Sequence, residues 1–269
     1  MRKAFVSILA GLTLGAVLTG GAFAQARENT VIVDIGPTIF GLAMAGALDG
    51  MLSDAAEDAN EDSDAGASGG SSGFGIAVQY ERQITKKFSV AGRFAYVGLG
   101  LGMSMTTDDA EAKIEEKISS ISIDAHGRYY PAGRTFFLDG ALGYANMTTS
   151  VSGKYREYDF VNGRKVLVNE EEPISFAAPR NFFKFGAKLG WRLAFGDAIK
   201  FVFEPALGYD VGIGGGDLIG TKFQKWARDN DADVFSDDDV KSLDDAWKIL
   251  ESVVFVGGPR ISLSFGCSF

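Results

Sequence analysis

This 269-residue chain is poor in the residue types from which disulfide scaffolds, metal centres and many catalytic sites are built. It contains one cysteine, Cys267, and one histidine, His126. A single cysteine excludes an intramolecular disulfide, and no Cys/His cluster with metal-ligand spacing is present. No glycine-rich phosphate loop and no Ser/His/Asp arrangement is present either. The sequence therefore predicts no catalytic residue, no metal and no cofactor, and we expect a protein that is not an enzyme.

Beyond its first 24 residues the chain also lacks an apolar run near the roughly 18 residues that a membrane helix needs. The longest such run, Ile39 to Leu48, is interrupted by Gly41 and Gly46. Yet the chain is 46% hydrophobic and contains 35 glycines. This combination favours either a soluble β-protein or a transmembrane barrel, whose strands each carry a weak alternating pattern. The net charge of −9 argues against nucleic acid as a partner.

Residues 1–24 have the pattern of a secretory signal peptide. Arg2 and Lys3 form a charged start, Ala4 to Leu18 an apolar stretch, and Ala22-Phe23-Ala24 a small-residue cleavage pattern. The alternative is an uncleaved anchor. The sequence predicts two parts, a signal peptide over 1–24 and one further domain over 25–269.

Alternation of apolar and polar residues predicts an all-β fold of eight strands. Their expected ranges are about 30–43, 73–84, 88–103, 118–130, 136–148, 182–195, 200–212, and a last strand that ends the chain and starts near Val253. Pro205 would remove a ladder donor from the seventh strand, so we expect a bulge there.

The connections between these strands alternate in length. Short ones are expected at 85–87, 131–135 and 196–199, and long ones at about 44–72, 104–117, 149–181 and 213–256. With the N-terminus on one side, every short turn falls on that side and every long loop on the other. Such sorting favours an eight-stranded antiparallel up-and-down transmembrane barrel, which has short periplasmic turns and longer outer loops.

Aromatic spacing agrees with that interpretation. The segments FFLDGALGY, from Phe136 to Tyr144, and FVFEPALGY, from Phe201 to Tyr209, each place Phe and Tyr eight residues apart on one face, as Phe88 and Tyr96 also do. Eight residues correspond to roughly 20 Å of height at the usual barrel tilt. This nearly matches the apolar band between two aromatic girdles, although aromatic residues are also simply common in strands.

The last ten residues carry the most specific pattern. From Arg260 onward apolar and polar residues alternate, and the chain stops on Phe269. This ending resembles the C-terminal strand of bacterial outer-membrane barrels, in which the terminal phenylalanine belongs to the assembly signal. The whole chain resembles the small eight-stranded barrels of the OmpA-domain, OmpX and OmpW type. The resemblance implies that residues 25–269 form an outer-membrane β-barrel domain. It also implies a location in the bacterial outer membrane, contact with its lipid, and folding by the barrel-assembly machinery after a periplasmic chaperone stage.

If the apolar face meets lipid, the opposite face lines the barrel and holds charges of both signs. The predicted lumen network comprises Glu81, Arg93, Asp124, His126, Arg128, Asp139, Lys184, Lys188, Arg192, Glu204, Asp210 and Arg260. Buried charges need partners, and eight strands enclose an interior that side chains can fill, so we expect a plugged lumen. In a soluble barrel the same charges would face solvent. His126 is interpreted as a member of this network rather than as a catalytic base.

Three predictions concern the outer loops. Asn162-Gly163 predicts a hairpin turn, and a capping box at Ser236 and Asp239 predicts a short helix in the last outer loop. Aspartates between 229 and 239 faintly resemble a calcium loop, but Val234 and Val240 stand where its glycine and closing glutamate belong. A solvated acidic loop is the alternative there.

Two function classes follow. The first is a structural or surface-interaction barrel with a charge-plugged lumen, whose acidic outer loops meet host or environmental ligands. The second is a narrow channel or an OmpW-like transporter of small hydrophobic molecules. The lumen lining separates them, because paired charges favour a plug and a continuous apolar tunnel favours transport.

Overall fold

The structure is a computed structural model that describes residues 28–39, 41–43, 45–47, 49–50, 66–107, 109–131, 133, 135–161, 164–170, 174–216, 221–222, 225 and 258–269. The predicted signal peptide over 1–24, the acidic segment over 229–239 and the helix predicted from Ser236 onward lie outside these residues.

The described residues form one antiparallel sheet of ten strands. These are β1 (Asn29–Asp34), β2 (Gly66–Thr85), β3 (Phe88–Thr106), β4 (Ala110–Tyr129), β5 (Phe136–Val161), β6 (Arg164–Glu170), β7 (Ile174–Trp191), β8 (Leu193–Phe195), β9 (Lys200–Gly216) and β10 (Gly258–Ser268).

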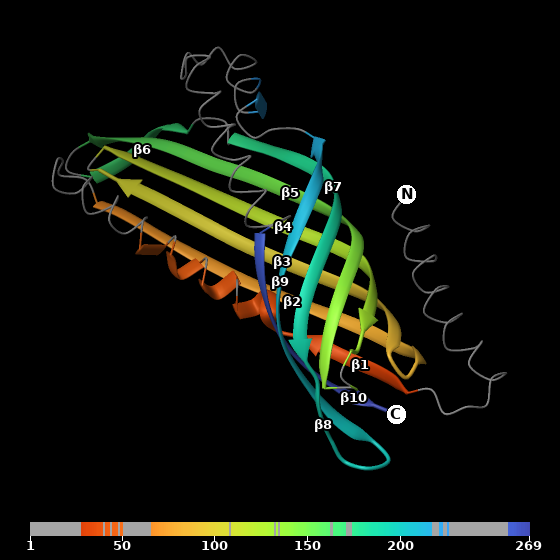
Figure 1. Cartoon of the computed structure of the whole chain (residues 1–269). Coiled ribbons are helices and arrows are strands. Elements are labelled where there is room, and N and C mark those ends of the chain that lie inside the picture. Colours follow the sequence, from red (N-terminus) through yellow and green to blue (C-terminus); the bar gives the residue numbers. More distant parts are fainter. Residues whose placement is uncertain are drawn as a thin grey trace.

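Eight of these strand positions close into a ring, so the fold is an all-β up-and-down barrel, as predicted (Figure 1). Neighbours in the ring follow the order β10, β1, β2, β3, β4, β5, β7 and β9, and β9 pairs back to β10. β8 pairs with β9 in the register that β7 began and therefore continues β7. β6 pairs only with the far end of β5 and lies outside the ring.

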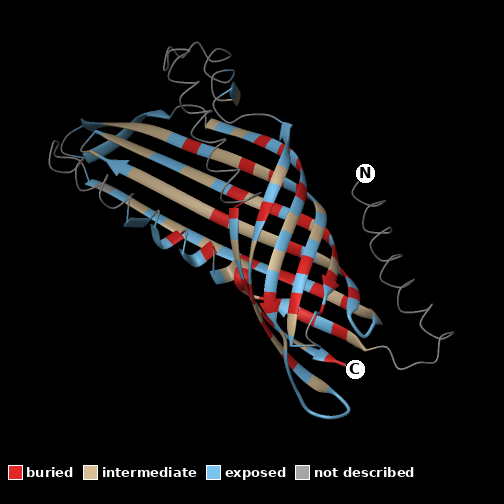
Figure 2. Cartoon of the chain, viewed as in Figure 1, coloured by how far each residue is buried: buried red, intermediate tan, exposed pale blue. Residues whose placement is uncertain are grey.

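The two faces of the strands are those that alternation predicted. Along β4, His126 and Arg128 are buried whereas Ile121 and Tyr129 are exposed. The same alternation repeats from strand to strand, as the checkered burial pattern in Figure 2 shows. Inside the ring lie charged side chains, small ones and a few large apolar ones such as Phe137 and Met147, whereas most large apolar side chains lie outside it.

The first strand is shorter than predicted. β1 ends at Asp34, and the described residues between 36 and 50 are helical instead of continuing the strand to Ala43. Pro37 explains the change, because proline lacks a ladder donor but is tolerated in the first turn of a helix. Asp34 Oδ1 accepts a hydrogen bond of 2.8 Å from the Gly36 backbone N–H at this transition.

The helix over residues 36–50 packs along β2. Thr38 donates a hydrogen bond to the carbonyl of Gly75, and Ser71 donates one to the carbonyl of Ala45. The approach requires glycine, because a Cβ on Gly73 would lie 2.1 Å from a backbone oxygen of the helix. The helix thus covers part of β2 that β1, being short, leaves unpaired.

Two of the four predicted long connections, 104–117 and 149–181, are largely strand in the described residues. β3 and β4 pair as far as Thr106 and Glu111, so the loop predicted at 104–117 is a tight turn on an extended hairpin. The segment predicted as a loop at 149–181 is likewise β-structure, and the hairpin predicted around Asn162-Gly163 is confirmed by the pairing of β5 with β6. β2 to β5 therefore extend well beyond β1 and β10, as Figure 1 shows. We call this the extended end and the opposite one, with the three short connections, the turn end.

No bulge occurs at Pro205. The register between β9 and β10 runs through Leu263↔Pro205 without a shift. On its other side, the ladder with β7 stops at Gly190↔Ala206 and resumes with β8 at Leu193↔Phe203. Pro205 lies in this gap, so its missing N–H is accommodated by an interrupted ladder rather than by an inserted residue.

Candidate functional site

The barrel interior holds every charged side chain that the sequence assigned to the lumen. The structure adds Asp34, at the end of β1, which alternation along a longer predicted strand did not single out. The interior thus contains six acidic and six basic side chains. The acids are Asp34, Glu81, Asp124, Asp139, Glu204 and Asp210, and the bases are Arg93, Arg128, Lys184, Lys188, Arg192 and Arg260. These side chains form two layers along the barrel axis.

The layer nearer the turn end is centred on Arg128. Its Nη1 lies 2.7 Å from Glu81 Oε2 and 2.8 Å from Glu204 Oε2, and its Nε lies 2.7 Å from Asp139 Oδ2. Arg128, Glu81, Asp139 and Glu204 are all buried. A buried charge is costly without partners. The Arg128 guanidinium pairs with three carboxylates from three other strands and so links four strands of the barrel.

Arg192 completes this layer. Its Nη2 lies 2.5 Å from Glu81 Oε2, and its Nε donates to Glu204. Tyr130 donates a hydrogen bond of 2.8 Å to the second oxygen of Glu81, and Phe137 packs beneath Arg128 with 4.5 Å between the guanidinium carbon and the ring centroid. Two aromatic rings and a shared ionic network thus close the turn end of the interior.

The layer nearer the extended end is looser. Arg93 contacts Asp34 at 2.9 Å and Asp124 at 3.3 Å. Lys184 Nζ lies between Asp124 and Asp210, at 3.5 and 3.6 Å, and Arg260 Nε lies 3.3 Å from Asp210. Most of these distances exceed those around Arg128, so the second layer is held by weaker contacts.

His126 lies inside the first layer, with no exposed nitrogen. Its Nδ1 is 2.7 Å from Asp139 Oδ1, and its Nε2 is buried without a hydrogen-bond partner among the described residues. No serine, cysteine or threonine hydroxyl or thiol is hydrogen-bonded to the ring in the described part of the chain. The arrangement therefore resembles a structural His–Asp pair rather than a nucleophile and its base.

Inward glycines make room for the carboxylates. A Cβ on Gly143 would lie 2.0 Å from Asp124 Oδ1, and one on Gly186 would lie 2.3 Å from Asp210 Oδ1. Cross-strand neighbours of an acid inside so narrow a ring must therefore be small.

Little empty space remains around His126 and around Glu81. One cavity of about 10 Å³ lies between His126, Arg93 and Lys188, and another of about 10 Å³ lies between Glu81, Tyr130 and Arg192. Each holds at most one water molecule. The side chains, rather than solvent, thus fill this part of the interior.

An inward apolar cluster lies beyond the charges, toward the extended end. It consists of Ala45 from the helix and Leu99, Ile118, Ala145, Met147 and Phe182 from four strands, with Val97 and Leu101 packed against it. Sequence reasoning did not assign it, although Ile118 and Phe182 share the alternation of the inward residues Ser122 and Lys184. The helix over 36–50, which the sequence did not predict, supplies its partner surface.

Two further features bear on chemistry. Among the described residues, no three His, Cys, Asp or Glu side chains gather as a metal site would require. In the same residues there is no helix with the length and apolar character needed to cross a membrane.

Fold and interior together define the class of protein: an eight-stranded antiparallel β-barrel with a charged, closely filled interior and an apolar outer surface. Comparisons of the chain with protein-family models, with curated proteins and with solved structures find no match.

Proposed function

We propose that this chain is an integral protein of the bacterial outer membrane, a small barrel of the OmpA-domain, OmpX or OmpW type with a charge-plugged lumen. Its role in this proposal is structural and at the surface, where its acidic outer segments meet host or environmental ligands.

The observation that carries the proposal is the inverted polarity of the barrel. Leu142 is 62% exposed, Phe183 65% and Leu207 54%, whereas Arg128 and Glu204 are buried. A barrel in water places its apolar face inside. An apolar belt that encircles a closed ring is stable against lipid but would drive association in water.

Aromatic pairs support a girdle at each edge of that belt. Phe136 packs edge-on against Trp191 toward the turn end, with 5.8 Å between ring centroids. Tyr144 packs against Phe183, also at 5.8 Å, eight residues farther along β5. Girdles of aromatic residues flank the lipid-facing band of outer-membrane barrels. The signal-like start over 1–24 and the terminal Phe269 support the same location.

Cell fractionation with a topology probe tests this proposal. We expect the full chain in the outer-membrane fraction, with an epitope between Val161 and Arg164 accessible to antibody on intact cells. The matched control is the same epitope at Lys86, in a short turn, which should be accessible only after the cells are broken. Recovery of the protein in a soluble fraction would overturn the proposal.

A second candidate function, transport of small hydrophobic molecules, is favoured by the inward cluster around Met147 and Phe182. That apolar lining ends at the ion-paired layers and does not run through the barrel. The single-channel conductance of the refolded protein separates the two functions: a large, steady current would favour the channel, and a low one the plug.

A further inference from the structure

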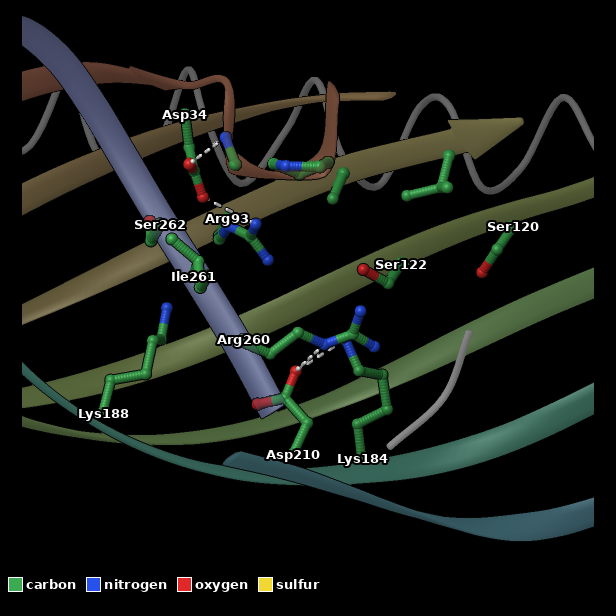
Figure 3. Close-up of a pocket in the computed structure, with 14 residues that line it drawn as sticks. Asp34, Arg93, Ser120, Ser122, Lys184, Lys188, Asp210, Arg260, Ile261 and Ser262 are labelled. Atoms are coloured by element: carbon green, nitrogen blue, oxygen red, sulfur yellow. Dashed lines mark hydrogen bonds and ion pairs between the residues drawn. The ribbon is translucent and has the colours of Figure 1, made fainter. Parts of the chain in front are cut away.

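One cavity in the barrel interior is lined mainly by charged and polar side chains. It lies on the extended side of the Arg128 layer and has a free volume of about 60 Å³. Its lining includes Arg93, Lys184, Lys188 and Arg260 but only two carboxylates, Asp34 and Asp210 (Figure 3). The cavity is therefore lined by more positive than negative charge.

The ion pairs around this cavity leave one positive charge without a carboxylate. Arg93 pairs with Asp34 and Asp124, Lys184 pairs with Asp124 and Asp210, and Arg260 pairs with Asp210. Within the described chain, no acidic oxygen lies within 4.0 Å of Lys188 Nζ. Among the lining residues that Figure 3 draws, contacts are marked for Arg93 and Arg260, and none joins Lys188 to another residue drawn.

Lys188 has an acid opposite it in the sheet, but that acid is engaged elsewhere. Its cross-strand neighbour on β5 is Asp139. Asp139 Oδ1 lies 2.7 Å from His126 Nδ1, and Asp139 Oδ2 lies 2.7 Å from Arg128 Nε. The amino group of Lys188 therefore lines the cavity with no carboxylate oxygen of the described residues within 4.0 Å, and Asp139 and Asp34 act on its charge only from farther away.

We propose that this cavity binds a small oxyanion, a phosphate or carboxylate group, through Lys188 with Arg260, whose strands meet the same residue of β9, Gly208. An ammonium in a confined, low-dielectric space gains more from an anion than it would in water. The cavity volume corresponds to about two molecules of liquid water. One phosphate or carboxylate group fits this space, whereas a long chain does not. The inference depends on the lumen geometry and not on the membrane location.

Inorganic phosphate and acetate are the probes. With the full chain refolded in detergent micelles, millimolar phosphate or acetate should raise the unfolding temperature above that in sodium chloride of equal ionic strength, because a ligand of the folded state stabilises it. Lys188→Met should weaken the binding of the stabilising anion by roughly 10- to 100-fold, and Lys188→Arg should retain most of it. Lys86→Met, in an exposed turn, is the matched control and should bind as the unaltered protein does.

Two results would overturn the proposal. One is that neither anion stabilises the unaltered protein beyond chloride, a measurement that needs no variant to fold. The other is that a folded Lys188→Met variant binds phosphate and acetate as tightly as the unaltered chain. Neither result depends on where the protein resides in the cell, so failure here is distinct from failure of the outer-membrane assignment.

Discussion

Arg128 shows how one residue can organise the interior of a barrel. It joins Glu81, Asp139 and Glu204, which come from three different strands, and it does so where water is largely excluded. Desolvation makes each of these charges costly alone, so the group is stable only as a set.

Arg128→Ala should therefore destabilise the barrel by about 3–5 kcal/mol, because it leaves buried carboxylates without a partner. It should also raise a low leak current, because the plug loses its central side chain. Reversible unfolding in lipid and planar-bilayer recording measure the two effects. The matched control is Arg156→Ala: Arg156 pairs with Glu170 at 2.9 Å on the surface, and exposed pairs contribute little. Equal losses for both variants would contradict the central role of Arg128.

Glu116 provides a pH-dependent test outside the proposed membrane span. It lies on β4 beyond the girdle level of Ile121 and Tyr96, and its Oε1 is buried without a hydrogen-bond partner among the described residues. Burial raises the pKa of Glu116 from 4.5 to about 7. The folded state thus holds a proton that the unfolded chain releases, and this stabilising contribution, complete below pH 4.5, is lost as the pH rises through 7.

Glu116→Gln should consequently leave stability unchanged near pH 4 and raise it at pH 8 relative to the unaltered chain. Unfolding curves at the two pH values measure the difference. Glu115→Gln, a change at a neighbouring exposed carboxylate paired with Lys113 at 2.7 Å, should give no gain at pH 8. A gain at pH 8 from Glu115→Gln but none from Glu116→Gln would show that burial does not govern the effect.

At the scale of a strand, the effect of a substitution on stability depends on whether the residue faces the barrel interior or its outer surface. On β5, Leu142 is exposed on the outer belt, and its neighbour Ala141 faces the interior beside His126. One residue along the strand therefore separates the proposed lipid face from the charged interior.

Leu142→Arg should destabilise the barrel in lipid by about 2–4 kcal/mol, as expected for a charge near the bilayer midplane. Ala141→Arg, the matched change on the inner face, should act through crowding and through the charge balance around Lys188. Unfolding in bilayers of two thicknesses distinguishes them, because only the outward arginine senses the lipid. No loss for Leu142→Arg would mean that this face does not meet the bilayer interior.

For the whole molecule, closure of the ring depends on the two ends of the described chain. Phe269 exchanges two backbone hydrogen bonds of 2.9 Å with Asn29, which extend the seam between β10 and β1. Its side chain is exposed on the outer belt.

Deletion of Phe269 should lower the amount of protein assembled in the outer membrane, because it removes both the seam contacts and the terminal aromatic of the proposed assembly signal. Phe269→Ala keeps the backbone bonds and should still impair assembly, whereas Phe269→Trp should largely retain it. Quantifying the protein in outer-membrane fractions measures these effects. Unchanged levels of the deletion variant would contradict the assembly role.

The sequence by itself determined the strand faces and the closed barrel. Alternation has a period of two whatever the strand's neighbours, so Arg128 and Leu142 were placed on opposite faces by local pattern alone. The ends of elements were less determined. Pro37 interrupts the first strand, but the apolar residues around it favour a continuous strand. Polar residues follow Met103, so the sequence predicts a loop where the structure has an extended hairpin.

Only the tertiary structure decided which charges meet, because an ion pair depends on register between strands that the sequence does not state. Asp34, the last residue of β1, meets Arg93, and the helical segment after it supplies Ala45 to an inward apolar cluster. The same three-dimensional arrangement engages both oxygens of Asp139 and leaves Lys188 with no carboxylate oxygen within 4.0 Å in the described chain. Alternation fixes the direction of a side chain, but distances across the barrel fix its partner.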